Sequence, residues 1–157
     1  MSDQGPEVGA LAPDFTAKNQ FGEDVTLSSF RGKTNVVLMF YPFAFTGICT
    51  GELCEIRDKS DQFAHDSAEV LSVSCDSPYT LKVFAEQEGL THQLLSDFWP
   101  HGDVSRAYGA FLEDKGFATR ATYVIDKDGI VRWKVINGPG EARSADEYLV
   151  ALEALPA

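Results

Sequence analysis

An apolar run from Val36 to Tyr41, followed at once by Pro42, constrains the fold of this chain more than any other stretch. The run is rich in β-branched and aromatic residues and is long enough for a buried central strand. Proline ends such a strand because it has no backbone N–H to donate to the sheet. A helical pattern follows, in which apolar residues recur four and seven positions after Cys49. The segment therefore predicts a buried strand, a short loop, and a helix whose first turn carries Cys49.

The predicted position of Cys49 indicates chemistry as well as structure. Unpaired N–H groups and the positive end of the helix dipole converge at a helix start, and such a position favours the reactive thiolate form of a cysteine. Most intracellular cysteines are instead small buried hydrophobes, so position alone leaves both interpretations open. Two neighbours favour reactivity. Thr46 can offer a hydroxyl to the same site, and Pro42 can cover the sulfur with a ring that has no proton to donate.

The spacing Pro42-x-x-x-Thr46-x-x-Cys49 resembles the active-site motif of the peroxiredoxins, and the surrounding FYPFAFTGICTGEL is similar to their alkyl hydroperoxide reductase E-like branch. Other segments resemble family segments in the same order: APDF from Ala12, LSSFRGK from Leu27, LLSDFWPHG from Leu94 and RATYVID from Arg120. The resemblance covers nearly the whole chain. It implies a thiol-dependent peroxidase that reduces hydrogen peroxide, alkyl hydroperoxides or peroxynitrite through a sulfenic acid on Cys49, in antioxidant defence and redox homeostasis.

The resemblance also implies roles for residues outside the loop. Arg120 opens the family's R-x-T-[FY]-[VI]-[IV]-D segment, which implies a cation beside the sulfur. A guanidinium can stabilise a thiolate and donate to a peroxide together. Without the family context, a surface residue at a strand start is the preferred interpretation of Arg120. Glu52, one helical turn after Cys49, can orient Arg120, and an exposed glutamate that suits the helix dipole is the alternative.

Two further cysteines bear on how the enzyme is recycled. The spacing of Cys49 and Cys54 resembles the resolving arrangement of the bacterioferritin-comigratory (Q-type) peroxiredoxins, whereas the alkyl hydroperoxide reductase E-like relatives are one-cysteine enzymes. Cys54 is therefore either a resolving cysteine, which would form a disulfide bond with Cys49, or a small residue packed on the helix. Cys75 ends a predicted strand and is interpreted as structural.

Composition excludes several other classes of protein. With 157 residues, 44% of them hydrophobic, the chain suits a single domain, residues 1–157. A net charge of −11 without a basic cluster argues against nucleic-acid and membrane partners. The three cysteines and three histidines show no ligand spacing, so we expect no metal, and no cofactor is implied. No apolar run approaches the roughly 20 residues of a membrane helix. The N-terminus lacks a signal-peptide pattern, and we expect a cytoplasmic protein.

The order of predicted elements is βαβ followed by ββα, the thioredoxin arrangement, so the expected fold class is α/β with a central mixed sheet flanked by helices. Strands are predicted over 12–18, 25–27, 36–41, 69–74, 94–96, 120–125 and 130–135. One helix should run from the Cys49 turn to about His65. A second should run from its N-cap Ser77 to Glu88, and a last should begin at Ser144 with a capping box to Glu147. Single helical turns are predicted at 27–30 and 104–108.

Two other function classes compete with a peroxidase. A thiol–disulfide oxidoreductase of thioredoxin type should carry C-x-x-C, which is missing. A non-catalytic thioredoxin-fold binding module or chaperone would have no reason to combine Pro42, Thr46, Cys49 and Arg120. The expected partners are a peroxide substrate and a reductant: thioredoxin, a glutaredoxin-like protein or a low-molecular-weight thiol. The family resemblance, and apolar loops with Phe43, Phe45 and Trp99, further predict a homodimer.

Overall fold

A seven-stranded mixed sheet in the order β2-β1-β5-β4-β3-β8-β9 organises the computed structural model, which describes residues 5–155. The elements follow in chain order: β1 (Thr16–Lys18), β2 (Asp24–Thr26), the 3₁₀ helix η1 (Leu27–Phe30), β3 (Asn35–Phe40), α1 (Gly47–Asp58), α2 (Ser60–His65), β4 (Ala68–Ser74), α3 (Pro78–Glu88), β5 (Gln93–Ser96), α4 (Asp103–Ala107), β6 (Phe111–Leu112), β7 (Phe117–Ala118), β8 (Arg120–Ile125), β9 (Val131–Asn137) and α5 (Ala145–Glu153).

Strand β3 lies inside the sheet, between β4 and β8, and is buried along its whole length. It pairs parallel with β4 and antiparallel with β8, so the sheet is mixed, as expected. Successive side chains of a strand point to opposite faces. Val37 and Met39 accordingly belong to one core cluster, and Leu38 and Phe40 belong to the other. A run without alternation fits this position because both faces of β3 are covered.

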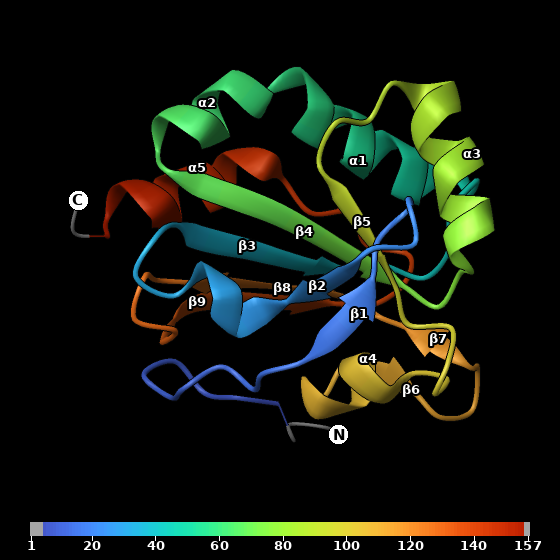
Figure 1. Cartoon of the computed structure of the whole chain (residues 1–157), viewed down its shortest axis with the longest axis horizontal. Coiled ribbons are helices and arrows are strands. Elements are labelled where there is room, and N and C mark those ends of the chain that lie inside the picture. Colours follow the sequence, from blue (N-terminus) through green and yellow to red (C-terminus); the bar gives the residue numbers. More distant parts are fainter. Residues whose placement is uncertain (1–4, 156–157) are drawn as a thin grey trace.

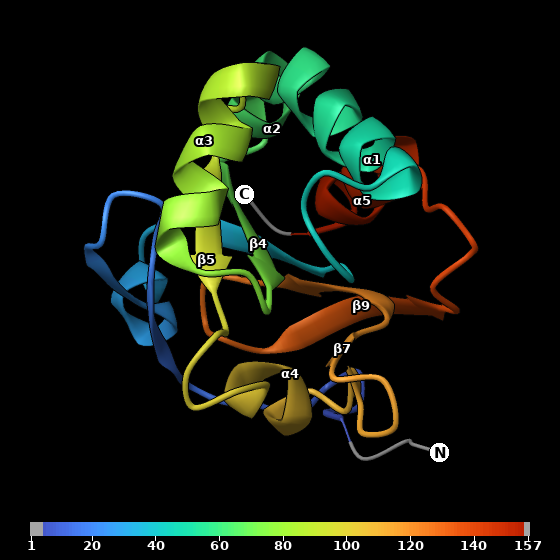
Figure 2. The same ribbon diagram turned by 90° about the vertical axis from the view of Figure 1, so that its right-hand side faces the viewer.

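Helices cover the two faces unequally. Helices α1, α2, α3 and α5 lie on one face, and α4 and the N-terminal segment lie on the other (Figures 1 and 2). The core cluster under the four helices contains Leu53 of α1, Phe84 of α3 and Tyr148 of α5. The loop after β3 leads into α1, so it lies on the side of the sheet that these four helices cover.

Most predicted boundaries of helices and strands agree with the structure, with the following differences. The helix predicted to run to His65 is interrupted at Lys59, which separates α1 from α2 although no proline or glycine marks the break. Ser144 is the N-cap of α5, but its hydroxyl accepts from the backbone N–H of Asp146 rather than from that of Glu147. The predicted strand over 12–18 is confined to β1, because only residues 16–18 pair with β2.

Helix α3 follows its local signals closely. The Ser77 hydroxyl accepts from the Thr80 N–H at 3.2 Å, Pro78 occupies the first turn, and Gly89 ends the helix with a left-handed φ of 67°. Glycine suits that position because other residues are strained there. The hairpin β6–β7 was not predicted, since strands of two residues carry no periodic signal.

Candidate active site

The loop after β3 brings three predicted residues to the start of α1. Tyr41 and Pro42 are buried at the end of the strand, and Thr46 is the N-cap residue of the helix. Cys49 lies in the first turn, with its side chain fully buried. The first-turn N–H groups of α1 have no partner within the helix and face the same region. The predicted place of Cys49 at a helix start beyond a buried strand is therefore correct.

The register between β3 and β8 explains why Arg120 lies beside this helix start. Met39 pairs with Thr122 in an antiparallel ladder, so the last residues of β3 lie opposite the first residue of β8. Arg120 is buried, and its Nη1 donates to the Cys49 sulfur at 3.1 Å. Its Nε donates to the Pro139 carbonyl at 2.6 Å, which fixes the plane of the guanidinium. The alternative interpretation of Arg120 as a surface residue is wrong.

Glu52 is buried and joins two arginines. Its Oε1 accepts from Arg120 Nη1 at 2.7 Å and from Arg143 Nη2 at 2.7 Å. Its Oε2 accepts from the backbone N–H of Arg143 at 2.7 Å and from Arg143 Nε at 2.9 Å. Glu52 therefore contacts Arg120, as the sequence predicted, and the alternative of an exposed first-turn glutamate is wrong.

Arg143 is the member of the site that sequence reasoning missed. Its Nη1 donates to the carbonyls of Phe40 and Ala121 and to the Thr122 hydroxyl, at 2.7 to 3.0 Å. It thus ties Glu52 to the ends of β3 and β8. A basic residue just before a helix N-cap is unfavourable to the helix dipole, and this was the only available local signal.

The cluster beside Cys49 contains both positive and negative side chains. Burial by itself would raise the pKa of Glu52, but hydrogen bonds from Arg143 and the charges of Arg143 and Arg120 outweigh burial and hold that pKa below its ordinary value. Two guanidiniums and one carboxylate leave one net positive charge. A thiolate on Cys49 neutralises that charge at 3.1 Å from Arg120 Nη1.

Thr46 contributes differently from the prediction. Its hydroxyl donates to the Phe43 carbonyl at 2.8 Å, so its proton is already used within the loop. A hydroxyl that donates still has lone pairs that can accept. In this conformation Thr46 therefore offers the site an acceptor rather than the donor that the sequence suggested.

The family model of the AhpC/TSA family matches residues 8–134 of the chain. The chain belongs to this family. Relatives of the chain include a 2-Cys peroxiredoxin and a thioredoxin peroxidase. The chain is 50% identical over 150 residues to alkyl hydroperoxide reductase E of Mycobacterium tuberculosis, a match that covers 96% of this chain and 98% of the relative.

More distant peroxiredoxins agree with this assignment. The chloroplastic 2-Cys peroxiredoxin BAS1 of Hordeum vulgare is 36% identical over 160 residues, with 96% of this chain and 75% of the relative covered. The crystal structure of peroxidoxin BcpB from Mycobacterium tuberculosis superimposes with a TM-score of 0.87 at 31% identity, and covers 96% of this chain and 99% of that chain. The thioredoxin-like peroxiredoxin fold and a thiol-dependent peroxidase function, both predicted from the sequence, are confirmed.

The other two thiols of this peroxiredoxin lie in different surroundings. Cys54 is half-buried on α1, and its sulfur donates to Glu88 Oε1 at 3.5 Å. Burial, and then Glu88, raise the pKa of the Cys54 thiol, although Arg57 opposes the shift. Cys75 is buried after β4, and burial followed by the charges of Asp97 and Asp76 raises its pKa to about 12. All three cysteines are free in this structure.

No group of His, Cys, Asp and Glu within residues 5–155 could hold a metal ion. Among these residues, no helix is both long and apolar enough to cross a bilayer.

Proposed function

We propose that Cys49 is the peroxide-reducing cysteine of this enzyme, acting on hydrogen peroxide, alkyl hydroperoxides or peroxynitrite. The observation that carries the proposal is the 3.1 Å hydrogen bond from Arg120 Nη1 to the Cys49 sulfur, in a cluster that one negative charge on sulfur makes neutral. Cys75 differs, because burial and then the charges of Asp97 and Asp76 raise the pKa of its thiol to about 12.

The reaction follows from the groups around the sulfur. The Cys49 thiolate attacks one peroxide oxygen, so that an S–O bond forms while the O–O bond breaks. The other oxygen leaves with the electron pair: hydroxide or alkoxide takes up a proton to become water or an alcohol, and peroxynitrite releases nitrite. Arg120 and the first-turn N–H groups of α1 stabilise the charge on the departing oxygen. Thr46 accepts a hydrogen bond from the peroxide, and Pro42 shields the sulfur. Cys49 ends as a sulfenic acid.

We propose that Cys54 then resolves the sulfenic acid by forming a disulfide. Two residues five positions apart on a helix have Cα atoms roughly 8.7 Å apart, whereas a disulfide tolerates about 7 Å. The first turn of α1 must therefore unwind. Gly47 and Gly51 lower its helix propensity. A thioredoxin, a glutaredoxin-like protein or a low-molecular-weight thiol would reduce the disulfide.

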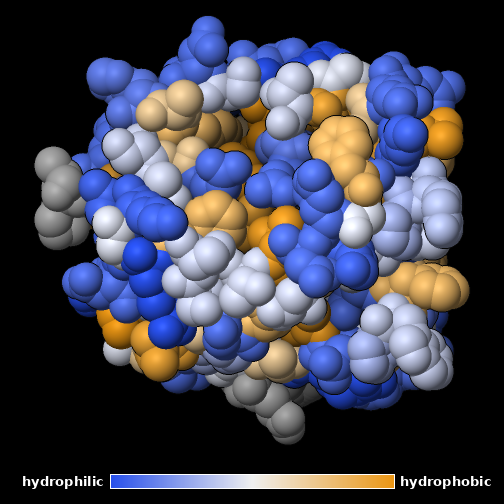
Figure 3. Space-filling view, viewed as in Figure 1, coloured by the Kyte–Doolittle hydropathy of each residue, from blue (hydrophilic) through white to orange (hydrophobic). Residues whose placement is uncertain are grey.

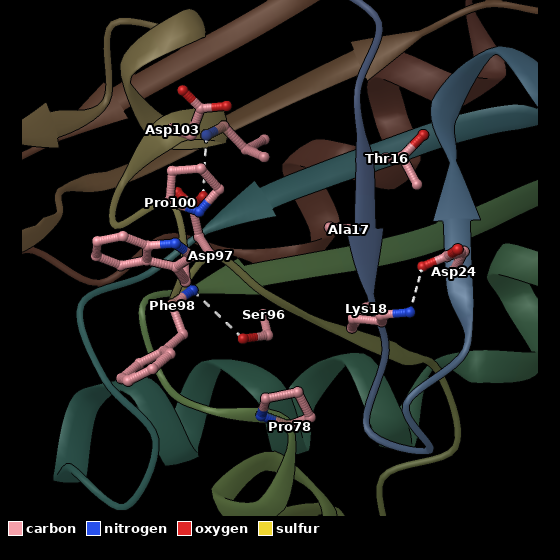
Figure 4. Close-up of a pocket in the computed structure, with 12 residues that line it drawn as sticks. Thr16, Ala17, Lys18, Asp24, Pro78, Ser96, Asp97, Phe98, Pro100 and Asp103 are labelled. Carbon is pink, nitrogen blue, oxygen red and sulfur yellow. Dashed lines mark hydrogen bonds and ion pairs between the residues drawn. The ribbon is translucent and has the colours of Figure 1, made fainter.

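We also propose a homodimer. Tyr79 and Trp99 are 84% and 81% exposed, and Phe98 is 52% exposed. Phe98 lies beside a pocket of about 320 Å³, where it and Pro100 face Thr16 and Lys18 across the hollow (Figure 4). The face shown in Figure 3 has its apolar side chains in small groups between hydrophilic ones. A second copy that covers Tyr79 and Trp99 would remove these aromatic surfaces from water.

Free thiols in the three cysteines support a reducing compartment, and we propose a cytoplasmic location. We further propose that residues 1–157 form one catalytic domain. Arg120 lies in a strand of a single seven-stranded sheet, and the loop and helix that carry Cys49 follow another strand of the same sheet.

Peroxide consumption tests the proposed function. The protein is supplied in turn with thioredoxin and its reductase, with a glutaredoxin-like protein, and with a small thiol, and the loss of peroxide is followed. The parent and the Cys75→Ser variant should consume peroxide with at least one reductant, whereas Cys49→Ser should not. Equal consumption by the Cys49→Ser variant would overturn the proposal.

A further inference from the structure

The loop that carries Thr46 contains a strained residue. Phe45 has a φ of 67°, in the left-handed region that aromatic residues rarely adopt. Such a conformation costs of order 1–3 kcal/mol and persists only where the surroundings hold it. The Phe45 ring packs against Phe84 of α3, with centroids 4.9 Å apart, yet Phe45 remains 51% exposed. The Thr46 hydroxyl closes the loop on the Phe43 carbonyl, and Phe43 packs against Phe117. One more contact reaches the loop from β4.

That contact comes from Asp76, which follows β4. Its Oδ2 accepts from the backbone N–H of Ala44 at 2.8 Å and from the Ser74 hydroxyl at 2.7 Å. The backbone of Asp76 is itself held, since its carbonyl accepts from the Ser96 hydroxyl at 2.6 Å. Asp76 thus connects the residue immediately before Phe45 to the rigid ends of β4 and β5.

We propose that Asp76 is a positioning residue of the peroxide site, whose carboxylate holds Ala44 and thereby fixes Pro42 and Thr46 relative to Cys49. This inference rests on the proposed role of Cys49 in attacking the peroxide. Ala44 lies two residues from each of Pro42 and Thr46. A shift of the Ala44 N–H therefore moves the groups that cover the sulfur and receive the peroxide.

The carboxylate of Asp76 acts here through its oxygen rather than through its charge. Both of its donors, the Ala44 N–H and the Ser74 hydroxyl, are neutral. Burial raises the pKa of Asp76, although these hydrogen bonds act in the opposite direction. An asparagine whose amide oxygen takes the place of Oδ2 could accept from both the Ala44 N–H and the Ser74 hydroxyl. The Asp76→Asn variant should therefore still hold the Ala44 N–H, whereas the Asp76→Ala variant should not.

Single-turnover oxidation of Cys49 by peroxide, measured by stopped flow, tests this role. Asp76→Ala should slow oxidation roughly 10-fold or more, as a displaced positioning group does. Asp76→Asn should stay nearer to the parent than to Asp76→Ala. Asp61→Ala, which removes the carboxylate of an exposed aspartate of α2, is the matched control and should react like the parent. Parent-like oxidation in Asp76→Ala, or a loss in Asp76→Asn equal to that in Asp76→Ala, would overturn the proposal.

Two further measurements separate positioning from folding. In the reduced parent, the Ala44 amide should resist hydrogen exchange; rapid exchange there would overturn the proposal even if Asp76→Ala does not fold. Glycine adopts a positive φ without strain, so a loop with Phe45→Gly should depend less on Asp76. Asp76→Ala should therefore slow oxidation less in the Phe45→Gly variant than in the parent. An equal loss of rate in both would contradict the proposal. Failure of the parent itself to react through Cys49 would instead refute the proposed function.

Discussion

Arg143 contacts Glu52 through its backbone N–H at 2.7 Å, its Nε at 2.9 Å and its Nη2 at 2.7 Å, and both side chains are buried. The same carboxylate accepts from the Arg120 Nη1 that contacts the Cys49 sulfur. The position of the cation beside the sulfur is therefore determined by a residue on α1 and by another just before α5. Cys49 and Arg120 thus form one cluster with the ends of β3 and β8.

We expect Glu52→Gln to destabilise the protein and to slow Cys49 oxidation. The amide leaves two buried guanidiniums without their counter-charge, and loss of one partner from a buried ion pair costs about 3–5 kcal/mol. Urea denaturation and stopped-flow oxidation measure the two effects. Glu86→Gln changes an exposed glutamate of α3 and should alter neither. Parent-like stability in Glu52→Gln would contradict the inferred electrostatic role.

Arg120→Met should slow the oxidation of Cys49 by peroxide on the order of 10²–10³-fold, because the thiolate and the departing oxygen both lose a donor. Arg132→Met is a matched control, since Arg132 is an exposed arginine on β9 that pairs with Asp126. A rate constant for Arg120→Met within a factor of about two of the parent would be incompatible with this role.

Treatment of the reduced parent with one equivalent of peroxide should yield a Cys49–Cys54 disulfide. Intact mass should fall by about 2 Da as two hydrogens are lost. Amide protection over residues 47–55 should fall at the same time, because the bond requires the first turn of α1 to unwind. Accumulation of a stable sulfenic acid in the parent, or equal recycling of Cys54→Ser with every reductant, would show that Cys54 only packs on the helix.

The free energy of unfolding should decrease as the pH is lowered from about 6.5 to 4, and His92 should account for part of the loss. Burial lowers the pKa of His92 to about 4, whereas an unfolded histidine has a pKa near 6.5. Within this window the unfolded state binds more protons, so acid favours unfolding. The full difference corresponds to about 3 kcal/mol at 1.36 kcal/mol per pKa unit.

Denaturation at pH 7 and pH 5 measures this dependence. His92→Gln should flatten it, while His65→Gln, which changes an exposed histidine, should leave the slope as in the parent. An unchanged slope in His92→Gln would assign the pH dependence to other groups.

Local signals predicted the parts of the fold that local physics determines. An uninterrupted apolar run predicted that both faces of β3 are buried. A serine cap, a first-turn proline and a final glycine predicted where α3 begins and ends. The place of Cys49 followed from the same reasoning, because a strand that ends at Pro42 and a nearby helix leave only a short loop between them.

Contacts distant in sequence could not be read in this way. Arg143 and Glu52 are 91 residues apart, and no spacing in the chain marks their pairing. The β6–β7 hairpin and the break at Lys59 likewise have no marker in the local sequence. Thr46 lies at the start of α1, as its position in the sequence indicated. The direction of its hydrogen bond depends on the carbonyl of Phe43, whose place only the loop conformation determines.

The site of oxidation tests the central claim most directly. Reduced Cys54→Ser protein is treated with one equivalent of peroxide, trapped with a sulfenic-acid reagent, digested and analysed by mass spectrometry. Because the resolving candidate is absent, we expect one oxygen, a gain of about 16 Da before trapping, on the peptide that contains Cys49. The peptide that contains Cys75 should remain unmodified. Oxygen on Cys75 with Cys49 still reduced would contradict the assignment of Cys49 as the cysteine that attacks the peroxide.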